Sequence, residues 1–255
     1  MKTSTMKDKL FKIFSIIFWI IIWEIGFLLI DRELYLPSPL STLTTLLTLI
    51  KVKTFWYTVF MTISRVIIGF IISCILGTLI GIICGLNKYF YNLFNPLIIT
   101  IKSTPVMSFI IIALIWFKSS NVPIFICFLM CFPIIWTSVV EGIHNVDNKL
   151  IEMARLYEVK KLDVLRGIYI PSIIPYVTTG MITALGLGWK VTVASEVLSS
   201  PKFSIGSKLY DAKVYLESEQ LFAWTIVVII FSMIFEYSFN YLIMKTFEIQ
   251  RIKNR

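Results

Sequence analysis

The stretch TVFMTISRVIIGFIISCILGTLIGIICGL, residues 58–86, decides the fold. Arg65 is its only charged residue. An α-helix rises about 1.5 Å per residue, so about 20 apolar residues cross the roughly 30 Å of hydrocarbon in a bilayer. The stretch is therefore long enough to span a membrane. Every fourth position of its second half is small: Gly69, Ser73, Gly77, Gly81 and Gly85.

Such a ladder of small residues lets a neighbouring helix approach closely, and close packing drives helix association in lipid. A pore-lining face or a sliding seam between helices is the alternative. We favour packing, and we expect this helix to be central to a bundle of helices.

The composition extends this interpretation to the whole chain. Of 255 residues, 57% are hydrophobic and only 15% are charged. A soluble domain of this size carries much more polar surface, so we predict an all-α integral membrane protein. Six spans are expected near 12–30, 58–86, 92–117, 122–142, 172–198 and 221–247.

Two details refine this pattern. Pro105 lies within the third predicted span, so that span is expected to be kinked or broken. A turn at residues 36–39 precedes a short amphipathic helix, which is expected to lie at the membrane interface. Lysine and arginine then set the orientation, because their excess of roughly two to one marks the cytoplasmic side. Both termini are assigned to the cytoplasm. The net charge of +9 is attributed to this topology and to the lipid surface, and no nucleic-acid patch is identified.

Several ionisable residues lie inside or close to the spans, where a charge costs roughly 2.5–3.5 kcal/mol and needs a reason. Arg65 and Glu141 are interpreted as snorkelling to a surface or lying near one. Lys190 and Glu196 are six positions apart, about 120° around a helix, so they are poorly placed to pair with each other. For Lys190 a salt bridge to another span is favoured over contact with an anionic substrate. Glu236 has no partner that the sequence identifies.

The sequence gives little support to enzymatic chemistry. No nucleophile–base pair, metal-ligand cluster or phosphate-binding glycine loop is present, so we predict that the chain is not an enzyme and holds no cofactor or metal. Cys127 and Cys131 could ligate a metal or form a disulfide, but we favour small packing residues. Energy must then come from an ion gradient or from another chain.

Mixed charge interrupts the apolar sequence at IEMARLYEVKKLDVLRGIYIP, residues 151–171. Within it, EMARLYEVKKLDVLRGIYIPSIIP at 152–175 resembles the cytoplasmic EAA loop of ABC importer permeases. Further resemblance to the nitrate/sulfonate/taurine branch of this binding-protein-dependent transport family covers most of the chain from about residue 56. It is carried by IKSTPVMSFIIIALIWFKSSNVP at 101–123, FPIIWTSVVEGIHNVDNKLIEMAR at 132–155 and GWKVTVASEVLSS at 188–200.

The resemblance implies a six-helix type I importer permease. Its parts would be an N-terminal tail, first span and interfacial helix at 1–57, a permease core at 58–247 with a cytoplasmic loop at 143–171, and a basic tail at 248–255. The residues that it implies for coupling to the ATPase are Glu152, Met153, Ala154, Arg155, Tyr157, Glu158, Leu162, Leu165, Arg166 and Pro171. Those placed near the translocation path are Thr104, Pro105, Met107, Trp189, Lys190, Thr192 and Glu196.

The resemblance also implies partners. Two copies of the chain would form the path in a bacterial cell membrane, two separate ATPase subunits would bind ATP and Mg²⁺, and an extracytoplasmic solute-binding protein would deliver the solute. Lys102 and Lys190 favour a small organic anion such as a sulfonate or taurine. A thiamine- or riboflavin-type precursor, stacked on Trp189 with Glu196 as counter-charge, is the alternative. A gradient-driven secondary transporter or channel is the alternative of another class.

The loop is interpreted as two short helices with apolar faces, ended by Pro171. Glu158 stands where the family pattern has glycine, and Lys118 replaces a second glycine. A glutamate forced to positive φ costs roughly 1–2 kcal/mol. We therefore expect a remodelled turn and hypothesise an ATPase partner with a matching basic contact.

Overall fold

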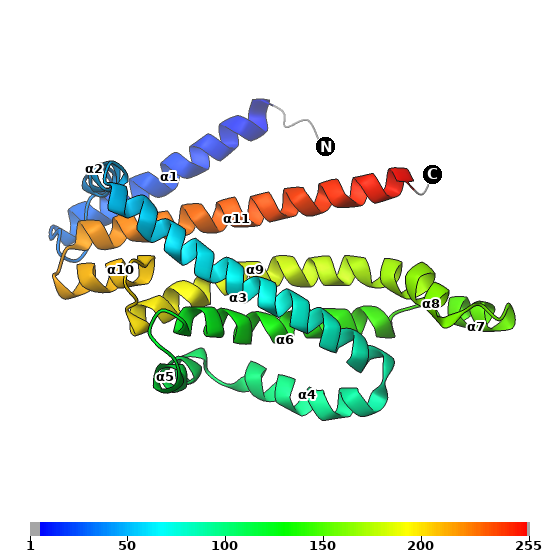
Figure 1. Ribbon diagram of the computed structural model, residues 1–255. Coiled ribbons are helices and arrows are strands. Elements are labelled where there is room, and N and C mark those ends of the chain that lie inside the picture. The colour runs from blue at the N-terminus through cyan, green and yellow to red at the C-terminus, as the bar shows by residue number, and fades with distance from the viewer. Residues whose placement is uncertain (1–5, 254–255) are drawn as a thin grey trace.

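The computed structural model describes the chain over residues 6–253, with the side chains of residue 11 and of residues 13–241. Every regular element in this part of the chain is helical (Figure 1). The elements are α1 (Met6–Ile30), α2 (Pro39–Ile50), α3 (Lys53–Leu86), α4 (Lys88–Ser103), α5 (Val106–Trp116), α6 (Val122–His144), α7 (Asn148–Leu156), α8 (Lys161–Val164), the π-helix η1 (Leu165–Tyr169), α9 (Ile170–Ser199), α10 (Ile205–Val214) and α11 (Ser218–Lys253).

The expected six spans are confirmed. Five helices are long and apolar enough to cross a bilayer, and the pair α4 and α5, bent by 103° at its break, makes six when it is counted as one broken span. The break lies at Thr104 and Pro105, as predicted. Proline disfavours the helical conformation in the residue before it, and Thr104 is accordingly extended, with φ −85° and ψ 133°. Pro105 then serves as the N-cap residue of α5.

Different elements lie at the two ends of the bundle (Figure 1). Helices α7 and α8 lie at the end where α11 finishes, and α2, α5 and α10 lie at the opposite end. The predicted basic tail at 248–255 continues α11 as far as Lys253. Residues 1–5 of the predicted N-terminal tail and residues 254–255 lie outside the described part of the chain. The turn and short helix expected after residue 36 are also present, because Ser38 caps α2 and accepts a hydrogen bond from the Ser41 N–H at 3.0 Å.

Helix α6 forms the centre of the bundle, with α3 on one side and α9 on the other. The small-residue ladder of α3 is the surface that meets α6. A Cβ placed on Gly69 would lie 2.7 Å from Cβ of Cys127, and one on Gly81 would lie 2.8 Å from Cβ of Val139. Ordinary side chains at these positions would separate the two helices. The packing interpretation of the ladder is confirmed.

The opposite side of α6 meets α9 in the same way. A Cβ on Gly188 would lie 2.8 Å from Sγ of Cys131. The Cys131 thiol also donates to the Ala184 carbonyl at 3.1 Å. Cys127 and Cys131 are both buried and free, so they are packing residues at these two helix contacts, as predicted.

Substitution of Gly81 tests this packing. We expect Gly81→Ala to destabilise the purified protein by about 1–3 kcal/mol, because the added methyl group forces α3 away from Val139. Thermal unfolding in detergent, followed by fluorescence-detected size exclusion, measures the effect. Gly167→Ala is the matched control, since no atom lies within 4 Å of a Cβ at that position. Equal melting temperatures for the two variants would contradict the account.

Candidate functional site

The loop between α6 and α9 extends from the end of the bundle as a helix, a turn and a second helix. Helix α7 is capped by Asp147, whose carboxylate accepts from the Lys149 N–H at 2.9 Å. The turn after α7 places Glu158 at φ 50°. The N–H of Val159 donates to the Ala154 carbonyl at 2.9 Å, and that of Glu158 donates to the Arg155 carbonyl at 3.1 Å. This is the Schellman arrangement, in which glycine is the usual residue at the left-handed position.

Glu158 therefore adopts the left-handed backbone conformation that glycine adopts without a Cβ penalty. The expectation of a remodelled turn is wrong, because the two capping hydrogen bonds hold the turn even though a glutamate is less favourable at positive φ. The side chain of Glu158 is exposed at the turn.

The tip of the loop presents apolar side chains to the outside. Leu156 is 81% exposed and Tyr157 is 74% exposed, and Met153 and Leu162 are more than half exposed. Ala154, expected on the same face, is instead buried in the protein. Leu156 was not singled out in the sequence, although its place at the end of α7 next to Tyr157 could have indicated it. We call Met153, Leu156, Tyr157 and Leu162 the loop tip.

Charged side chains surround the loop tip, and a groove lies behind it. Glu152, Arg155 and Arg166 are all exposed. The groove has a volume of about 600 Å³. Its lining residues are Leu86, Ile151, Ala154, Arg155, Glu158, Val159, Lys161, Val164, Leu165 and Tyr169.

The second helix of the loop does not end at Pro171. Helix α8 passes through the π-helix η1 directly into α9, and Lys161–Ser199 is one continuous helical run. Pro171 lies in the first turn of α9. In a continuous α-helix, a proline leaves the carbonyl four residues earlier without its N–H donor, and the proline ring clashes with that carbonyl. The π turn immediately before it accommodates the proline. The loop is thereby joined to the span without a break.

Three residues predicted near the path lie inside the subunit instead. Trp189 is buried and its indole N–H donates to the Val228 carbonyl at 3.0 Å. Thr192 is buried and donates to the Gly188 carbonyl at 2.7 Å. Glu196 is completely buried. Trp189 and Glu196 connect α9 to neighbouring helices, Thr192 bonds within α9, and the three buried side chains do not face an open path in this structure.

Glu196 is held by Arg65, on α3, in a buried ion pair of 2.8 Å. The other Glu196 oxygen accepts from the Thr62 hydroxyl at 2.9 Å and from the Gly206 N–H at 3.2 Å. Arg65 also donates to the carbonyls of Lys202 and Phe203, each at 3.3 Å. The interpretation of Arg65 as a snorkelling residue is wrong, because its guanidinium is enclosed by these partners. The ion pair joins α3, α9 and the start of α10.

Lys190 is the fourth residue of α9 that was predicted near the path, and it lies on the exposed face of the helix. Lys190 is exposed, and no described carboxylate lies within 4.0 Å of it, so the favoured salt bridge to another span is wrong for this subunit. Lys102 of α4 is also exposed and contacts the Thr137 hydroxyl at 2.9 Å. Pro105 and Met107 are exposed beside the break, and Thr104 is half-buried. Their role in a path stays a prediction.

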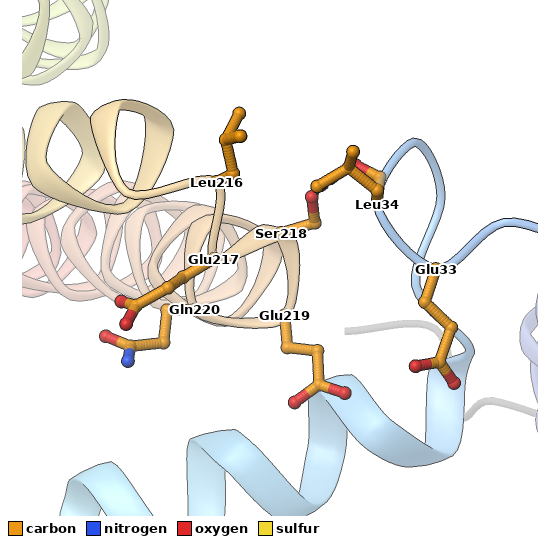
Figure 2. Close-up of a pocket in the computed structure, with 7 residues that line it drawn as sticks. All are labelled: Glu33, Leu34, Leu216, Glu217, Ser218, Glu219 and Gln220. Atoms are coloured by element: carbon orange, nitrogen blue, oxygen red, sulfur yellow. Dashed lines mark hydrogen bonds between the residues drawn. The ribbon is translucent and has the colours of Figure 1, made fainter.

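An acidic pocket of about 380 Å³ lies at the opposite end of the bundle from the loop tip. Figure 2 shows the carboxylates of Glu33, Glu217 and Glu219 around it. The Ser218 hydroxyl donates to the Leu34 carbonyl and so joins the α1–α2 connection to the start of α11. Among the side chains described, no group of three or more histidine, cysteine or acidic residues is arranged to hold a metal ion.

The relatives of this chain that we compare are all named as permeases of transport systems. The chain is 28% identical to the bicarbonate transport system permease CmpB of Synechococcus elongatus over 62% of this chain, and spans little more than half, 57%, of that relative. It is 24% identical to the taurine transport system permease TauC of Escherichia coli, over 84% of this chain and 80% of the relative. Permeases named for nitrate import and for aliphatic sulfonates match as well.

A solved structure of the MetNI methionine ABC transporter in an inward-facing conformation shares the fold. It matches with a TM-score of 0.59 and 14% identity, over 74% of this chain and 93% of that one. The helical spans, broken third span and projecting loop thus have the fold of a type I ABC importer permease, a multi-pass integral membrane protein. Residues 77–247 match the family model of the binding-protein-dependent transport system inner membrane component, and the chain belongs to that family.

The buried ion pair makes a quantitative prediction. Arg65→Met should destabilise the purified protein by about 3–5 kcal/mol, because it leaves the Glu196 carboxylate buried without its cation. The double variant Arg65→Met/Glu196→Gln should recover most of this loss, since no unpaired charge is left. Chemical unfolding in detergent gives the coupling energy. Additive losses in the double variant would show that the two residues act independently.

The turn at Glu158 leads to a second prediction. Glu158→Gly should stabilise the turn by roughly 1 kcal/mol, since glycine adopts positive φ without the Cβ penalty. Hydrogen–deuterium exchange of residues 156–161 should become slower in this variant. Glu158→Ala is the control, because it removes the carboxylate and keeps the Cβ. Equal exchange in the glycine and alanine variants would contradict the assignment of strain to the backbone.

Proposed function

We propose that two copies of this chain form the membrane path of an ATP-driven importer for a small anion in a bacterial inner membrane. Two separate ATPase subunits dock on the loop between α6 and α9. A solute-binding protein delivers the anion at the opposite end of the bundle. The observation that carries the proposal is the exposed loop tip, whose last residue, Leu162, lies on the helical run that continues without a break into the span α9.

The loop tip has the character of a docking surface. Leu156 and Tyr157 project from the bundle end, where they have few neighbours, and exposed apolar side chains of this size favour burial against a partner. The charged rim of Glu152, Arg155 and Arg166 can fix the register of that partner. ATP and Mg²⁺ would be held by the ATPase, so this chain itself catalyses no reaction.

The connection of the loop to α9 gives docking a mechanical consequence. A push on the loop tip is transmitted along one helical run from Lys161 to Ser199. Because α9 packs tightly on α6 and α6 on α3, these helices would turn together. Access to the path then changes by a shift between two arrangements of the two subunits.

The anionic substrate is supported by unpaired positive charge. Lys102 and Lys190 are exposed within the spans and have no described carboxylate within 4.0 Å. Cations inside a membrane segment mark substrate or ion pathways. The relatives named above are permeases for bicarbonate and for taurine, both of which carry an anionic group. A sulfonate or taurine-like solute fits these observations.

The alternatives have less support. An aromatic precursor would need Trp189 and Glu196 free, but Trp189 packs between α9 and α11, and Glu196 is paired with Arg65. The same ion pair leaves Glu196 poorly suited as the proton site of a gradient-driven transporter. Family membership also favours an importer powered by a separate ATPase.

Leu156→Asp tests the docking proposal. The variant should lose most of the ATPase subunit that co-purifies with the wild-type chain, together with ATP-dependent uptake, because a carboxylate replaces the most exposed apolar residue of the loop tip. Leu216→Asp is the matched control for recovery of the ATPase, at an exposed leucine of the pocket at the opposite end of the bundle (Figure 2). Undiminished recovery of the ATPase with Leu156→Asp would refute the assignment of the loop tip.

A further inference from the structure

The groove behind the loop tip lies where the loop meets the membrane-spanning helices. Its volume is about 600 Å³. Three parts of the chain form its walls: Leu86 is the last residue of α3, Ile151 and Ala154 belong to α7, and Val164 and Tyr169 belong to the helical run that enters α9. A molecule in this groove would therefore touch both the loop and two spans.

One end of the groove lies at the edge of the membrane, on the side that the excess of lysine and arginine assigns to the cytoplasm. Leu86 ends the span α3, and Asn87 and Lys88 follow it, so the hydrocarbon layer ends close to Leu86. Tyr169 directly precedes α9, and tyrosine is enriched at the boundary between lipid and water. Lipid acyl chains can therefore reach this end of the groove.

The part of the groove that belongs to the loop carries charge. Arg155 and Lys161 line it, together with Glu158, so two cations and one anion leave a net charge of +1. Neither cation has a carboxylate within 4.0 Å among the side chains described. An anionic group that enters the groove thus meets two cations that are not already paired.

The separation of the charged part from the apolar end suits a phospholipid. Lys161 and Tyr169 are eight residues apart on one helical run, which is about 12 Å along the axis. One headgroup layer of a bilayer is roughly 5–8 Å thick, and the long stems of lysine and arginine let their charges reach back toward it. A phosphate held by the two cations would leave its acyl chains beside Leu86 and Tyr169.

We propose that this groove binds one anionic phospholipid, with its phosphate at Arg155 and Lys161 and its acyl chains against Leu86 and Tyr169. Basic segments next to a span attract the anionic lipids of the cytoplasmic leaflet, and the net positive charge of the groove favours them over zwitterionic lipids. The bound lipid ties the loop to α3, because the walls of the groove belong to both. The site does not depend on which solute the permease carries.

Native mass spectrometry of the purified permease in detergent tests the site. The probes are phosphatidylglycerol, which is anionic, and phosphatidylcholine with identical acyl chains, which is zwitterionic. Titration of each lipid gives a dissociation constant for the first lipid bound. Phosphatidylglycerol should bind about fivefold more tightly, the preference expected for one net positive charge at the membrane surface. Glycerophosphoglycerol, which is the same headgroup without acyl chains, should not compete at equal concentration.

Three variants assign the charges. Lys161→Gln should remove most of the preference for phosphatidylglycerol, which is a loss of about fivefold. Lys160→Gln is the matched control, because Lys160 is an exposed neighbouring lysine that does not line the groove, and it should keep the preference. Glu158→Gln should increase the preference by a similar factor, since it removes the negative charge from the groove.

Equal wild-type affinity for the two lipids would overturn the proposal. Equal losses in Lys161→Gln and Lys160→Gln would also overturn it, since they mark diffuse attraction to a basic surface, and so would an unchanged preference in Glu158→Gln. Competition by glycerophosphoglycerol would show that the groove binds a free anion and no lipid.

The same titration on the permease–ATPase complex separates the lipid from the other possible occupant of the groove. The preference that depends on Lys161 should persist in the complex. Its loss when the ATPase binds would assign the groove to the ATPase and overturn the lipid site. That result would leave the proposed import function standing, because co-purification of the ATPase and ATP-dependent uptake judge that function separately.

Discussion

The close approach of α3, α6 and α9 is the constraint on which the rest of the structure depends. In lipid no hydrophobic effect drives helices together, so association relies on packing and on interhelical hydrogen bonds. Glycines on α3 and α9 bring both helices against α6, and the hydroxyl of Ser73, within the α3 ladder, donates to the Phe128 carbonyl at 3.1 Å. The three helices form one unit in which no helix can shift without displacing the other two.

Both ends of this unit are attached to further elements of the structure. At one end α9 continues through a π turn into α8, so Leu162 of the loop tip lies on an extension of a packed helix. At the other end the Arg65–Glu196 ion pair ties α10 to α3 and α9. A buried ion pair is weak support for stability, because desolvation offsets its Coulomb attraction. Its contribution here is geometric: it fixes where α10 and the adjoining acidic pocket lie relative to the core.

Local sequence features predicted much of this architecture. The length of the apolar stretches predicted the spans, Pro105 predicted the break, and the small-residue ladder on α3 predicted the contact with another helix. Each of these features depends on residues that are close together in the chain. Arg65 and Glu196 are 131 positions apart, and periodicity carries no information about such a pair. Pro171 does not end the element as predicted, because the π turn before it accommodates the proline inside one helical run. Glu158 was recognised as the position that needs positive φ, but not that the turn would keep its form.

Helix α9 has one face buried in the bundle and another that is exposed. Glu196, Thr192 and Trp189 face inward and hold the bundle together, while Lys190 faces outward. Since these residues lie within two turns of one another, residue type alone could not have assigned them. Position around the helix decides, and it depends on which neighbours α9 meets.

The central claim is that each subunit moves as one unit from the loop tip to the opposite end of the bundle. Spin labels at Leu162 and Tyr215, both exposed, would report this distance by pulsed electron paramagnetic resonance. Labelled subunits diluted with unlabelled ones, in complex with the ATPase, restrict the signal to one subunit. The account predicts the same distance distribution without ATP and in an ATP-trapped state. A shift beyond the width of the ATP-free distribution would contradict it.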